Sequence, residues 1–493
     1  MPDCPVIAAV DLGSNSFRLQ VARVVDGEVF PLESSKETVR LAAGIDRSGH
    51  LNPESQAELN AAMARFGAIL ARYQPDCVRA VATNTFRVAG NRQAFLPAAE
   101  AALGYPIDII SGREEARLIY LGAAHSLPAT RERRMVLDIG GGSTELIIGS
   151  GFRAHVTESV QLGCVAWSLR YFPDGLINAE RMAAAELAAR GTLLPLVPEF
   201  RAGQWHRAIG TSGTARSLAD ILELNEFSSF GITRDGLARL RAELLTAGHI
   251  DRVELNGLRA DRRPVLPGGF AILNAAFEMF GIQRMSVTYG ALRDGILYDL
   301  MARSASQDVR DRTVAAFVRR YHADVGQSER VRMLAQELFA HFCPGEAELQ
   351  HRLGMAGALH EIGRTIAHQD YARHTAYILA WSDMLGFAER EQAWLSWMTG
   401  AQCGPLPALA ASSPADIAAL LALRLAVLLT RARSDCVWPE GWQGGAVTAG
   451  QCYEFDLPAS WLANAPLIEQ ALQEEIAAWQ ATGITLRVPA LSR

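Results

Sequence analysis

Two stretches of the chain repeat one pattern of hydrophobic and polar positions. In each, a hydrophobic run ends in an aspartate, a short turn of small and polar residues follows, and a second hydrophobic run begins. The copies lie at 6–24 and 135–148 and align on Asp11 and Asp138. The other coinciding residues are Gly13 with Gly140, Ser16 with Ser143 and Leu19 with Leu146. The pattern predicts two β-hairpins in two related subdomains.

Strand-like and helix-like patterns alternate through the first three hundred residues. Strands are predicted at 78–83, 107–110 and 285–289, and a polar loop at 84–91. Helices are predicted at 92–103, 113–124, 176–194, 216–224 and 296–301, with one more ending at Phe280 after Gly268 and Gly269. A small-residue turn at 208–215 follows another short strand. This alternation predicts an α/β fold whose functional groups lie on loops after strands.

Near residue 302 the pattern becomes that of amphipathic helices. They are predicted at 331–342, 346–359, 372–385, 389–398 and 416–431. A strand around 447–449, a helix at 460–482 and a strand at 484–488 then predict a small α/β appendix. We place a boundary at Arg303–Gln307 and expect three domains, at 1–124, 125–302 and 303–493.

The composition is that of a globular protein. Of 493 residues, 49% are hydrophobic and 20% charged, and the net charge of −6 argues against a nucleic-acid coat. No hydrophobic run approaches the roughly 18 residues of a membrane span, since Arg424 interrupts 417–429. Asp3 and Asp11 flank the first hydrophobic run, which is unlike a signal peptide. Seven cysteines without a CxxC pair favour a reduced cytoplasmic protein. Any membrane contact is expected to be peripheral at most.

Basic residues are almost all arginines. Lysines and arginines together number 47, and Lys36 is the one lysine in the sequence. No lysine follows a glycine, so a P-loop of the G-x-x-x-x-G-K-[ST] type is excluded. Phosphate contacts in this chain must therefore come from arginine, from hydroxyl and amide side chains, or from backbone N–H groups.

The two predicted turns have the chemistry of a phosphate clamp. Small residues let the backbone approach an anion, and successive N–H groups can converge on its oxygens. The aspartates at 11 and 138 can bind a hydrated Mg²⁺ next to phosphates. A single such turn is most simply an ordinary hairpin. Because the pattern occurs twice, with aspartate before and serine after, we predict phosphate binding between the two copies.

Two charged residues in the intervening loops are further candidates. Arg87 follows a predicted strand in a Thr/Asn-rich loop, where its guanidinium suits phosphate oxygens, although a surface arginine is an equal alternative. Glu114 and Glu115 open a predicted helix, where the helix dipole favours acidic residues. We interpret Glu114 as a solvated helix-capping residue and Glu115 as a candidate general base for water.

Several motifs in combination resemble those of the exopolyphosphatase and guanosine pentaphosphate phosphohydrolase family. That family belongs to the actin, sugar-kinase and heat-shock-chaperone ATPase superfamily. The motifs are VDLGSNSFRL at 10–19, ATNTFRVAGN at 82–91, ISGREEARL at 110–118, DIGGGSTEL at 138–146, GTSGT at 210–214 and YGALRDG at 289–295. The resemblance covers nearly the whole chain.

The resemblance implies two duplicated actin-like, ribonuclease H-like subdomains and a helical, HD-like C-terminal domain. It implies a homodimer that releases orthophosphate from inorganic polyphosphate with Mg²⁺, or converts guanosine pentaphosphate to tetraphosphate. Glu115 falls on the family's catalytic glutamate. The phosphate-binding candidates are Ser14, Asn15, Ser16, Arg18, Arg87, Gly140, Gly141, Gly142 and Ser143, and the metal-binding candidates are Asp138, Glu145 and Asp11.

The C-terminal domain departs from the family pattern at two places. His360-Glu361 stands where an HD-type domain would have His-Asp, and Gln327-Ser328 stands where we expect its first histidine. We therefore do not expect a second metal centre. The uncharged stretch 399–405 replaces a basic segment found in relatives that bind long polyphosphate.

Three other functions remain open from the sequence. The same fold can act on guanosine pentaphosphate, since both substrates end in a phosphoanhydride. A sugar kinase or chaperone-like ATPase would need an acceptor pocket and usually an aspartate base, where this chain has a glutamate. An actin-like filament or nucleotide sensor would not need Glu115 and a complete second hairpin.

Overall fold

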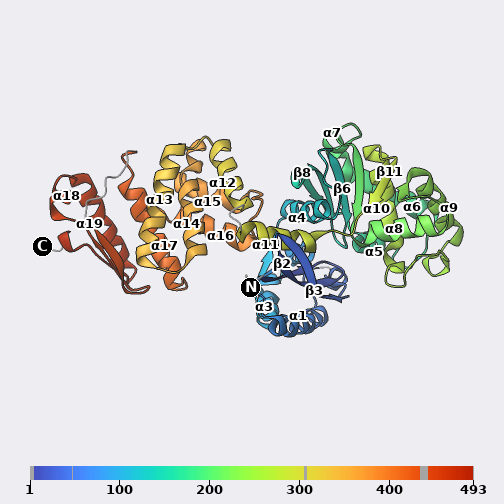
Figure 1. Cartoon of the computed structure of the whole chain (residues 1–493), viewed down its shortest axis with the longest axis horizontal. Helices are drawn as coiled ribbons and strands as arrows, with labels where there is room; N and C mark the ends of the chain where they lie inside the picture. Colours follow the sequence, from blue (N-terminus) through green and yellow to red (C-terminus); the bar gives the residue numbers. More distant parts are fainter. Residues whose placement is uncertain (1–4, 47, 305–307, 434–441, 492–493) are drawn as a thin grey trace. The chain divides into compact units, whose positions relative to one another are not determined.

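The computed structural model describes residues 5–46, 48–304, 308–433 and 442–491. The chain divides into two compact units, Met1–Asp308 and Val309–Arg493 (Figure 1). The boundary predicted at Arg303–Gln307 lies partly outside the described residues. Asp3, Cys4 and Cys436 lie outside them altogether. The five described cysteines are free.

The first unit contains two sheets of the same topology. The first has the order β3-β2-β1-β4-β5 and the second β8-β7-β6-β9-β11-β10. In each, an antiparallel hairpin, β1–β2 or β6–β7, lies beside a parallel strand, β4 or β9. The bounds are β1 Val6–Leu12, β2 Phe17–Val25, β3 Glu28–Glu37, β4 Cys77–Ala82, β5 Ile107–Ile109, β6 Arg134–Ile139, β7 Thr144–Ser150, β8 Arg153–Val160, β9 Arg207–Thr211, β10 Ile232–Thr233 and β11 Arg284–Val287. The two predicted hairpins and the duplication are confirmed.

Helices cover both sheets and mostly match the predicted ranges. They are α1 Pro53–Tyr73, α2 Asn84–Val88, α3 Arg92–Leu103, α4 Gly112–His125, α5 Cys164–Tyr171, α6 Ala179–Leu193, α7 Val197–Phe200, α8 Ser212–Leu224, α9 Arg234–Ala247, α10 Leu266–Phe280 and α11 Leu292–Ser304. Three predictions were wrong in detail. The predicted loop 84–91 contains α2, whose Phe86 packs edge-on against Phe95. Helix α8 already begins at Ser212, and Gly268 and Gly269 lie inside α10, where they leave room for α5 and for Thr214 of α8, respectively.

Helices α4 and α11 cross at very close range through two glycines. A Cβ added at Gly295 of α11 would overlap the Leu118 carbonyl oxygen of α4, and one at Gly122 would overlap the Ala291 carbonyl oxygen. Hydrophobic residues of α4 and α11 also share one core with residues of both sheets. The glycines therefore fix how α4 is held between the two halves of the unit.

The substitution Gly295→Ala is expected to destabilise the first unit by about 1–3 kcal/mol, because an added methyl group overpacks this crossing. Thermal unfolding would measure the change. Gly191→Ala is the matched control, since Gly191 lies in α6 with nothing within 4 Å of an added Cβ. The control should raise the unfolding temperature slightly, because alanine favours a helix over glycine. Equal melting of the two variants would contradict the close crossing.

A buried ion cluster reinforces the same crossing. Arg117 donates to both carboxylate oxygens of Glu114 at 2.8 Å and to Asp299 of α11 at 2.6 Å, and Arg79 of β4 donates to Asp299 at 2.5 Å. Burial raises the pKa of Asp299, but Arg117 and Arg79 outweigh it and hold that pKa below its ordinary value. Glu114 is fully buried, so its interpretation as a solvated residue was wrong. The cause is Arg117, which supplies a buried counter-charge.

The second unit is helical with a small terminal sheet. Its elements are α12 Val309–Arg320, α13 Val325–Phe342, α14 Ala347–Leu359, α15 Tyr371–Trp381, α16 Glu389–Gly400, α17 Pro414–Leu429, β12 Gln443–Thr448, β13 Cys452–Asp456, α18 Ala459–Ala463, α19 Pro466–Ala481 and β14 Thr485–Arg487. The sequence prediction missed α12 and β13. The predicted helix 460–482 is two helices, since α18 ends before Pro466, which occupies the first turn of α19. Arg424, inside the apolar α17, forms a buried ion pair with Glu475 at 2.5 Å.

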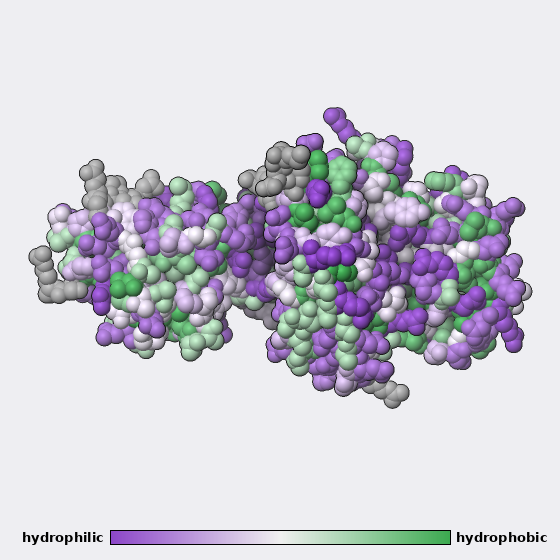
Figure 2. All heavy atoms as spheres, turned by 60° about the horizontal axis from the view of Figure 1, so that its bottom comes forward, coloured by the Kyte–Doolittle hydropathy of each residue, from purple (hydrophilic) through white to green (hydrophobic). Residues whose placement is uncertain are grey.

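The surface mixes hydrophilic and hydrophobic residues over the face that Figure 2 shows. Among the described residues, the search for an apolar helix of transmembrane length finds none.

Candidate active site

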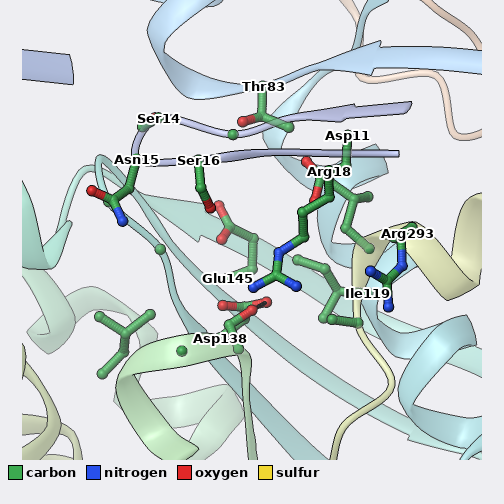
Figure 3. A pocket seen from close by; sticks show the side chains of 18 of the residues that line it. Asp11, Ser14, Asn15, Ser16, Arg18, Thr83, Ile119, Asp138, Glu145 and Arg293 are labelled. Carbon is green, nitrogen blue, oxygen red and sulfur yellow. Dashed lines mark hydrogen bonds between the residues drawn. The ribbon is translucent and has the colours of Figure 1, made fainter. Parts of the chain in front are cut away.

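The turns of the two hairpins face each other in the first unit. An added Cβ on Gly141 would lie 3.2 Å from the Cβ of Ser14 and 3.3 Å from the backbone nitrogen of Asn15. The second turn is closed by a hydrogen bond from the Gly140 N–H to the Ser143 carbonyl at 2.9 Å. Figure 3 shows side chains from both hairpins, among them Arg18, Asp138 and Glu145, directed into the space beside the turns. The facing arrangement predicted from the repeat is therefore present.

A cavity of about 140 Å³ lies at this junction. It is lined by most of the predicted candidates: Asp11, Ser14, Asn15, Ser16, Arg18, Glu115, Asp138, Gly140, Gly141, Ser143 and Glu145. Arg87 and Gly142 are not among its lining residues. The structure thus gathers residues from β1, β2, α4, β6 and β7 around one space, although they are far apart in the sequence.

Four carboxyl groups line the cavity and repel one another: Glu115, Asp138 and Glu145 are buried, and Asp11 is partly buried. Burial raises the pKa of Asp11 to about 7, although Arg18 opposes this, and burial raises the pKa of Asp138 to about 6. Burial, together with the charges of Glu115 and Asp138, raises the pKa of Glu145 well above its ordinary value. Such a cluster is stable in its ionised form only beside compensating positive charge. The cavity is therefore suited to a cation.

Glu115 lies in the first turn of α4, which begins where the Ser111 side chain accepts the Glu114 N–H. Its Oε2 accepts a hydrogen bond from Arg87 Nη1 at 2.8 Å, and the same nitrogen donates to the Ile110 carbonyl at 2.9 Å. Burial raises the pKa of Glu115, and Arg87 opposes the rise. Arg87 thus pairs with the candidate base in this structure, so its predicted contact with phosphate stays a prediction.

Arg87→Ala is expected to move the acidic limb of the activity profile to higher pH. Arg87 lowers the pKa of Glu115, so its removal raises that pKa, and more alkaline conditions are needed to ionise the base. Turnover measured from pH 5 to 10 would show the shift. Arg113→Ala is the control, since Arg113 pairs with Glu158 and is not among the cavity-lining residues. An unchanged limb in Arg87→Ala would contradict the coupling.

The donor set fits Mg²⁺ held partly by water and substrate. Within the described ranges, no three His, Cys, Asp or Glu side chains group closely enough to hold a metal ion on their own. Mg²⁺ is commonly bound by one or two carboxylates, with waters and substrate phosphates completing its shell. Asp138, Glu145 and Asp11 line the cavity and stay the predicted ligands, with water and substrate completing the shell. The raised pKa values of Asp138 and Asp11 give this assignment a physical basis.

Sequence reasoning missed a serine that orients Asp138. The Ser212 hydroxyl donates to Asp138 Oδ2 at 2.6 Å. Ser212 has φ of 63°, in the left-handed region that costs a non-glycine residue energy and is enriched at functional sites. It lies where β9 meets α8, at the third small-residue turn. That turn was the available signal, because the two hairpins had already led us to predict phosphate binding at such turns.

Sequence reasoning also missed three arginines that line the cavity: Arg216, Arg262 and Arg293. Burial lowers the pKa of Arg18 and of Arg216, and their arginine neighbours lower each further. The Nε of Arg293 is buried without a hydrogen-bond partner in the described part of the chain. Arginines that crowd one another and keep a free buried donor are suited to an anion with several charges. Arg293 lies within the motif 289–295, which gave the one signal for it.

The second unit contains the residues expected at a degenerate HD-type site. His360 is buried, and its Nδ1 lies 2.8 Å from the Gly357 carbonyl. Glu361 accepts hydrogen bonds from Arg364 at 3.0 Å and from Arg433 at 2.6 Å. Gln327 donates to the Thr430 carbonyl at 3.0 Å. The side chain of Glu361 and the amide of Gln327 are thus hydrogen-bonded to other residues of the second unit.

Comparisons with known proteins identify relatives over both units. The model described as the Ppx/GppA phosphatase family matches residues 20–304, and the model for domain III of Ppx/GppA phosphatases matches 309–476. A guanosine-5'-triphosphate,3'-diphosphate pyrophosphatase of Vibrio cholerae serotype O1 is 36% identical over 483 residues, or 96% of this chain and 95% of that protein. The protein of the same name from Vibrio atlanticus is 36% identical over 479 residues, with the same coverage.

Two solved structures support the fold. An exopolyphosphatase from Cytophaga hutchinsonii has a TM-score of 0.55 at 22% identity, covering 60% of this chain and 97% of that chain. An Aquifex aeolicus member of the Ppx/GppA family has a TM-score of 0.51 at 23% identity, covering 61% of this chain and 98% of that chain. The expected fold, two actin-like lobes followed by a helical C-terminal domain, is confirmed.

Proposed function

Because the chain belongs to the Ppx/GppA phosphatase family, whose members hydrolyse phosphoanhydrides, we propose that it releases terminal orthophosphate from a polyphosphorylated substrate. One observation carries the proposal. A single cavity combines two facing small-residue turns, four carboxyl groups, three of them buried, and a set of arginines. Phosphoryl transfer requires mainly positioning and charge stabilisation, and this cavity offers groups for both.

The turns and the arginines position the substrate. Backbone N–H groups of 14–16 and 141–142 and the Ser143 hydroxyl bind oxygens of the terminal phosphate, whereas the Gly140 N–H closes the second turn. Arg18, Arg216 and Arg293 bind the next phosphates. Mg²⁺, when bound, neutralises charge that develops on the transferred group and on the bridging oxygen. Asp138, oriented by Ser212, would hold that ion together with Glu145 and Asp11.

Glu115 orients the attacking water and accepts its proton. As the water oxygen bonds to phosphorus, the bridging phosphorus–oxygen bond opposite breaks, and the shortened substrate leaves with the electron pair. Burial raises the pKa of Glu115, and Arg87 limits this rise and so favours the ionised base. A general base of this kind typically contributes about 10²- to 10⁴-fold in rate.

Two substrates fit this chemistry. Inorganic polyphosphate is supported by the group of arginines in the cavity, since such a chain needs repeated anion contacts and nothing else. Guanosine 5'-triphosphate 3'-diphosphate is supported by the Vibrio relatives, which are named for it and align over 96% of this chain. Both end in the phosphoanhydride that the proposed mechanism cleaves.

Phosphate release from the two substrates, each with Mg²⁺ at equal concentration of phosphate groups, tests the proposal. ATP without an acceptor and ATP with a sugar serve as controls. Turnover of either polyphosphorylated compound well above that of ATP supports the proposal. ADP formation that depends on the sugar would instead indicate a kinase, and no phosphate release from any compound would refute the proposal.

A further inference from the structure

The arginines that line the candidate active site are not paired with carboxylates of the protein. Among the described residues, none of the four forms an ion pair: Arg18, Arg216, Arg262 and Arg293. By contrast, two buried arginines of the second unit, Arg310 and Arg424, pair with Glu391 at 2.6 Å and with Glu475 at 2.5 Å. A guanidinium without a carboxylate partner keeps its full attraction for an anionic ligand. It must then be oriented by uncharged groups.

Arg216 is oriented by a carbonyl group and an aromatic ring. Its Nε donates to the Ser212 carbonyl at 3.0 Å, one turn earlier in α8. Its Cζ lies 5.4 Å from the centre of the Tyr289 ring, within the range of a cation–π interaction. Within the described ranges, these are the contacts that fix the guanidinium, and neither of them neutralises it. Its two Nη groups stay available for an anion in the cavity.

Tyr289 is held in place by its backbone, although its side chain is 76% exposed. The Thr288 N–H donates to the Gly210 carbonyl at 3.0 Å, and the Thr211 hydroxyl donates to the Gly290 carbonyl at 2.7 Å. Both contacts join the loop before α11 to the end of β9, directly before α8 begins. The ring is therefore fixed relative to the helix that carries Arg216. Because it is so exposed, it contributes little to the core.

Arg262 is oriented in a second way, by a glycine. A Cβ added at Gly213 would lie 2.0 Å from Nη2 and 2.3 Å from Cζ of Arg262, so the guanidinium packs directly against the first turn of α8. Asp261, its acidic neighbour in the sequence, pairs with Arg259 at 2.9 Å and with Lys36 at 3.5 Å. Arg262 is thus also placed by an uncharged surface, and its position requires a residue without a side chain at 213.

We propose that Tyr289 and Gly213 are positioning residues that hold Arg216 and Arg262 toward the inner phosphates of the substrate without neutralising them. A carboxylate in either place would orient the arginine equally well, but it would compete with phosphate for the same N–H groups. The inference rests on the proposed function, because it assumes that phosphates bind in this cavity. It goes further in assigning substrate affinity to two uncharged residues that act through their arginines.

Tyr289→Leu tests the aromatic contact at an exposed position. We expect KM for long-chain polyphosphate to rise about 2- to 5-fold, the value of one exposed cation–π contact, with a smaller change in kcat. The rise should shrink at high ionic strength, which screens the arginine. Tyr289→Phe should restore KM, because phenylalanine keeps the aromatic face. Tyr377→Leu, at an exposed tyrosine of α15 outside the cavity, should alter neither constant.

Gly213→Ala tests the second contact by displacing Arg262. We expect KM to rise about 10-fold, as for a weakened hydrogen bond to a charged group. Tm should not fall, because the added methyl group meets the movable end of a long side chain. In an Arg262→Ala background the same change should have no further effect, and Tyr289→Leu should have none in an Arg216→Ala background. Gly191→Ala, with open space around it, should leave KM unchanged.

A binding measurement separates positioning from catalysis. In a Glu115→Gln background with Mg²⁺, both variants should weaken calorimetric binding of tripolyphosphate by the same factors as they raise KM. Unchanged affinity in both variants, or effects that add fully to those of the arginine substitutions, would overturn the positioning role. Phosphate release by the unmodified protein would then continue to support the proposed function. No phosphate release from any substrate would instead refute that function.

Discussion

Glu115→Gln is expected to lower turnover by roughly 10²- to 10⁴-fold while substrate binding persists. Glutamine keeps the size of the side chain and can still accept a hydrogen bond from Arg87, but it cannot take a proton from water. The loss falls on the chemical step, because the turns and the arginines that bind phosphate are untouched. Binding should even tighten, since one of four mutually repelling carboxylates is removed from the cavity.

Phosphate release under saturating substrate and calorimetric binding of polyphosphate would measure the two effects. Glu186→Gln is the matched control, because Glu186 is also buried and ion-paired, to Arg241 at 3.0 Å, yet lies outside the cavity. The control should lose some stability and keep its turnover. If Glu115→Gln released phosphate at the rate of the unmodified protein, the water-activating role would have to belong to another group.

Asp138→Asn is expected to reduce turnover by about 10²-fold or more and to raise the Mg²⁺ concentration needed for half-maximal activity. The amide still accepts the Ser212 hydrogen bond, so the side chain keeps its position, but it carries no charge for the cation. In the unmodified protein, Mg²⁺ must compete with protons at Asp138, whose pKa is raised to about 6 by burial. Its metal requirement should therefore rise as the pH falls toward 6, and this dependence should weaken in the variant.

The same substitution should stabilise the protein in the absence of Mg²⁺. The pKa of Asp138 is about 6 in the folded state, above its ordinary 3.8, so ionisation costs folding free energy as the pH rises between these values. At neutral pH asparagine removes that cost, which is of the order of ~1–3 kcal/mol, and Tm should increase. Asp220→Asn, at an exposed position of α8, should change neither Tm nor the Mg²⁺ titration. A lower Tm together with an unchanged titration would place the ion elsewhere.

The periodic parts of the fold could be predicted from the sequence because each is specified locally. Both hairpins follow from hydrophobic runs on either side of a polar turn, and helix α4 from the capping residue Ser111 and the pattern after it. The boundaries that failed depend on tertiary packing. Gly268 and Gly269 weaken a helix by local propensity, yet they lie inside α10, because an added Cβ would overlap α5 at Gly268 and Thr214 of α8 at Gly269.

The candidate site could be predicted where the repeat or the resemblance marked it, and not elsewhere. Asp11 and Asp138 occupy equivalent positions in the two hairpins, so the duplication predicts that both line the same cavity. Arg216 and Arg262 belong to no repeated motif, and only the folded chain brings them to the cavity. Glu114 illustrates the opposite error. Its helix position suggested exposure, and the buried Arg117 that reverses this is visible only in three dimensions.

The glycine contact between α4 and α11 ties the positions of these two helices to each other. Helix α11 is the last helix of the first unit, and the chain continues from it toward the second. Where two backbones touch, no flexible side chain lies between them to absorb a displacement. A displacement of α11 within the first unit is therefore passed to α4, the helix that carries Glu115.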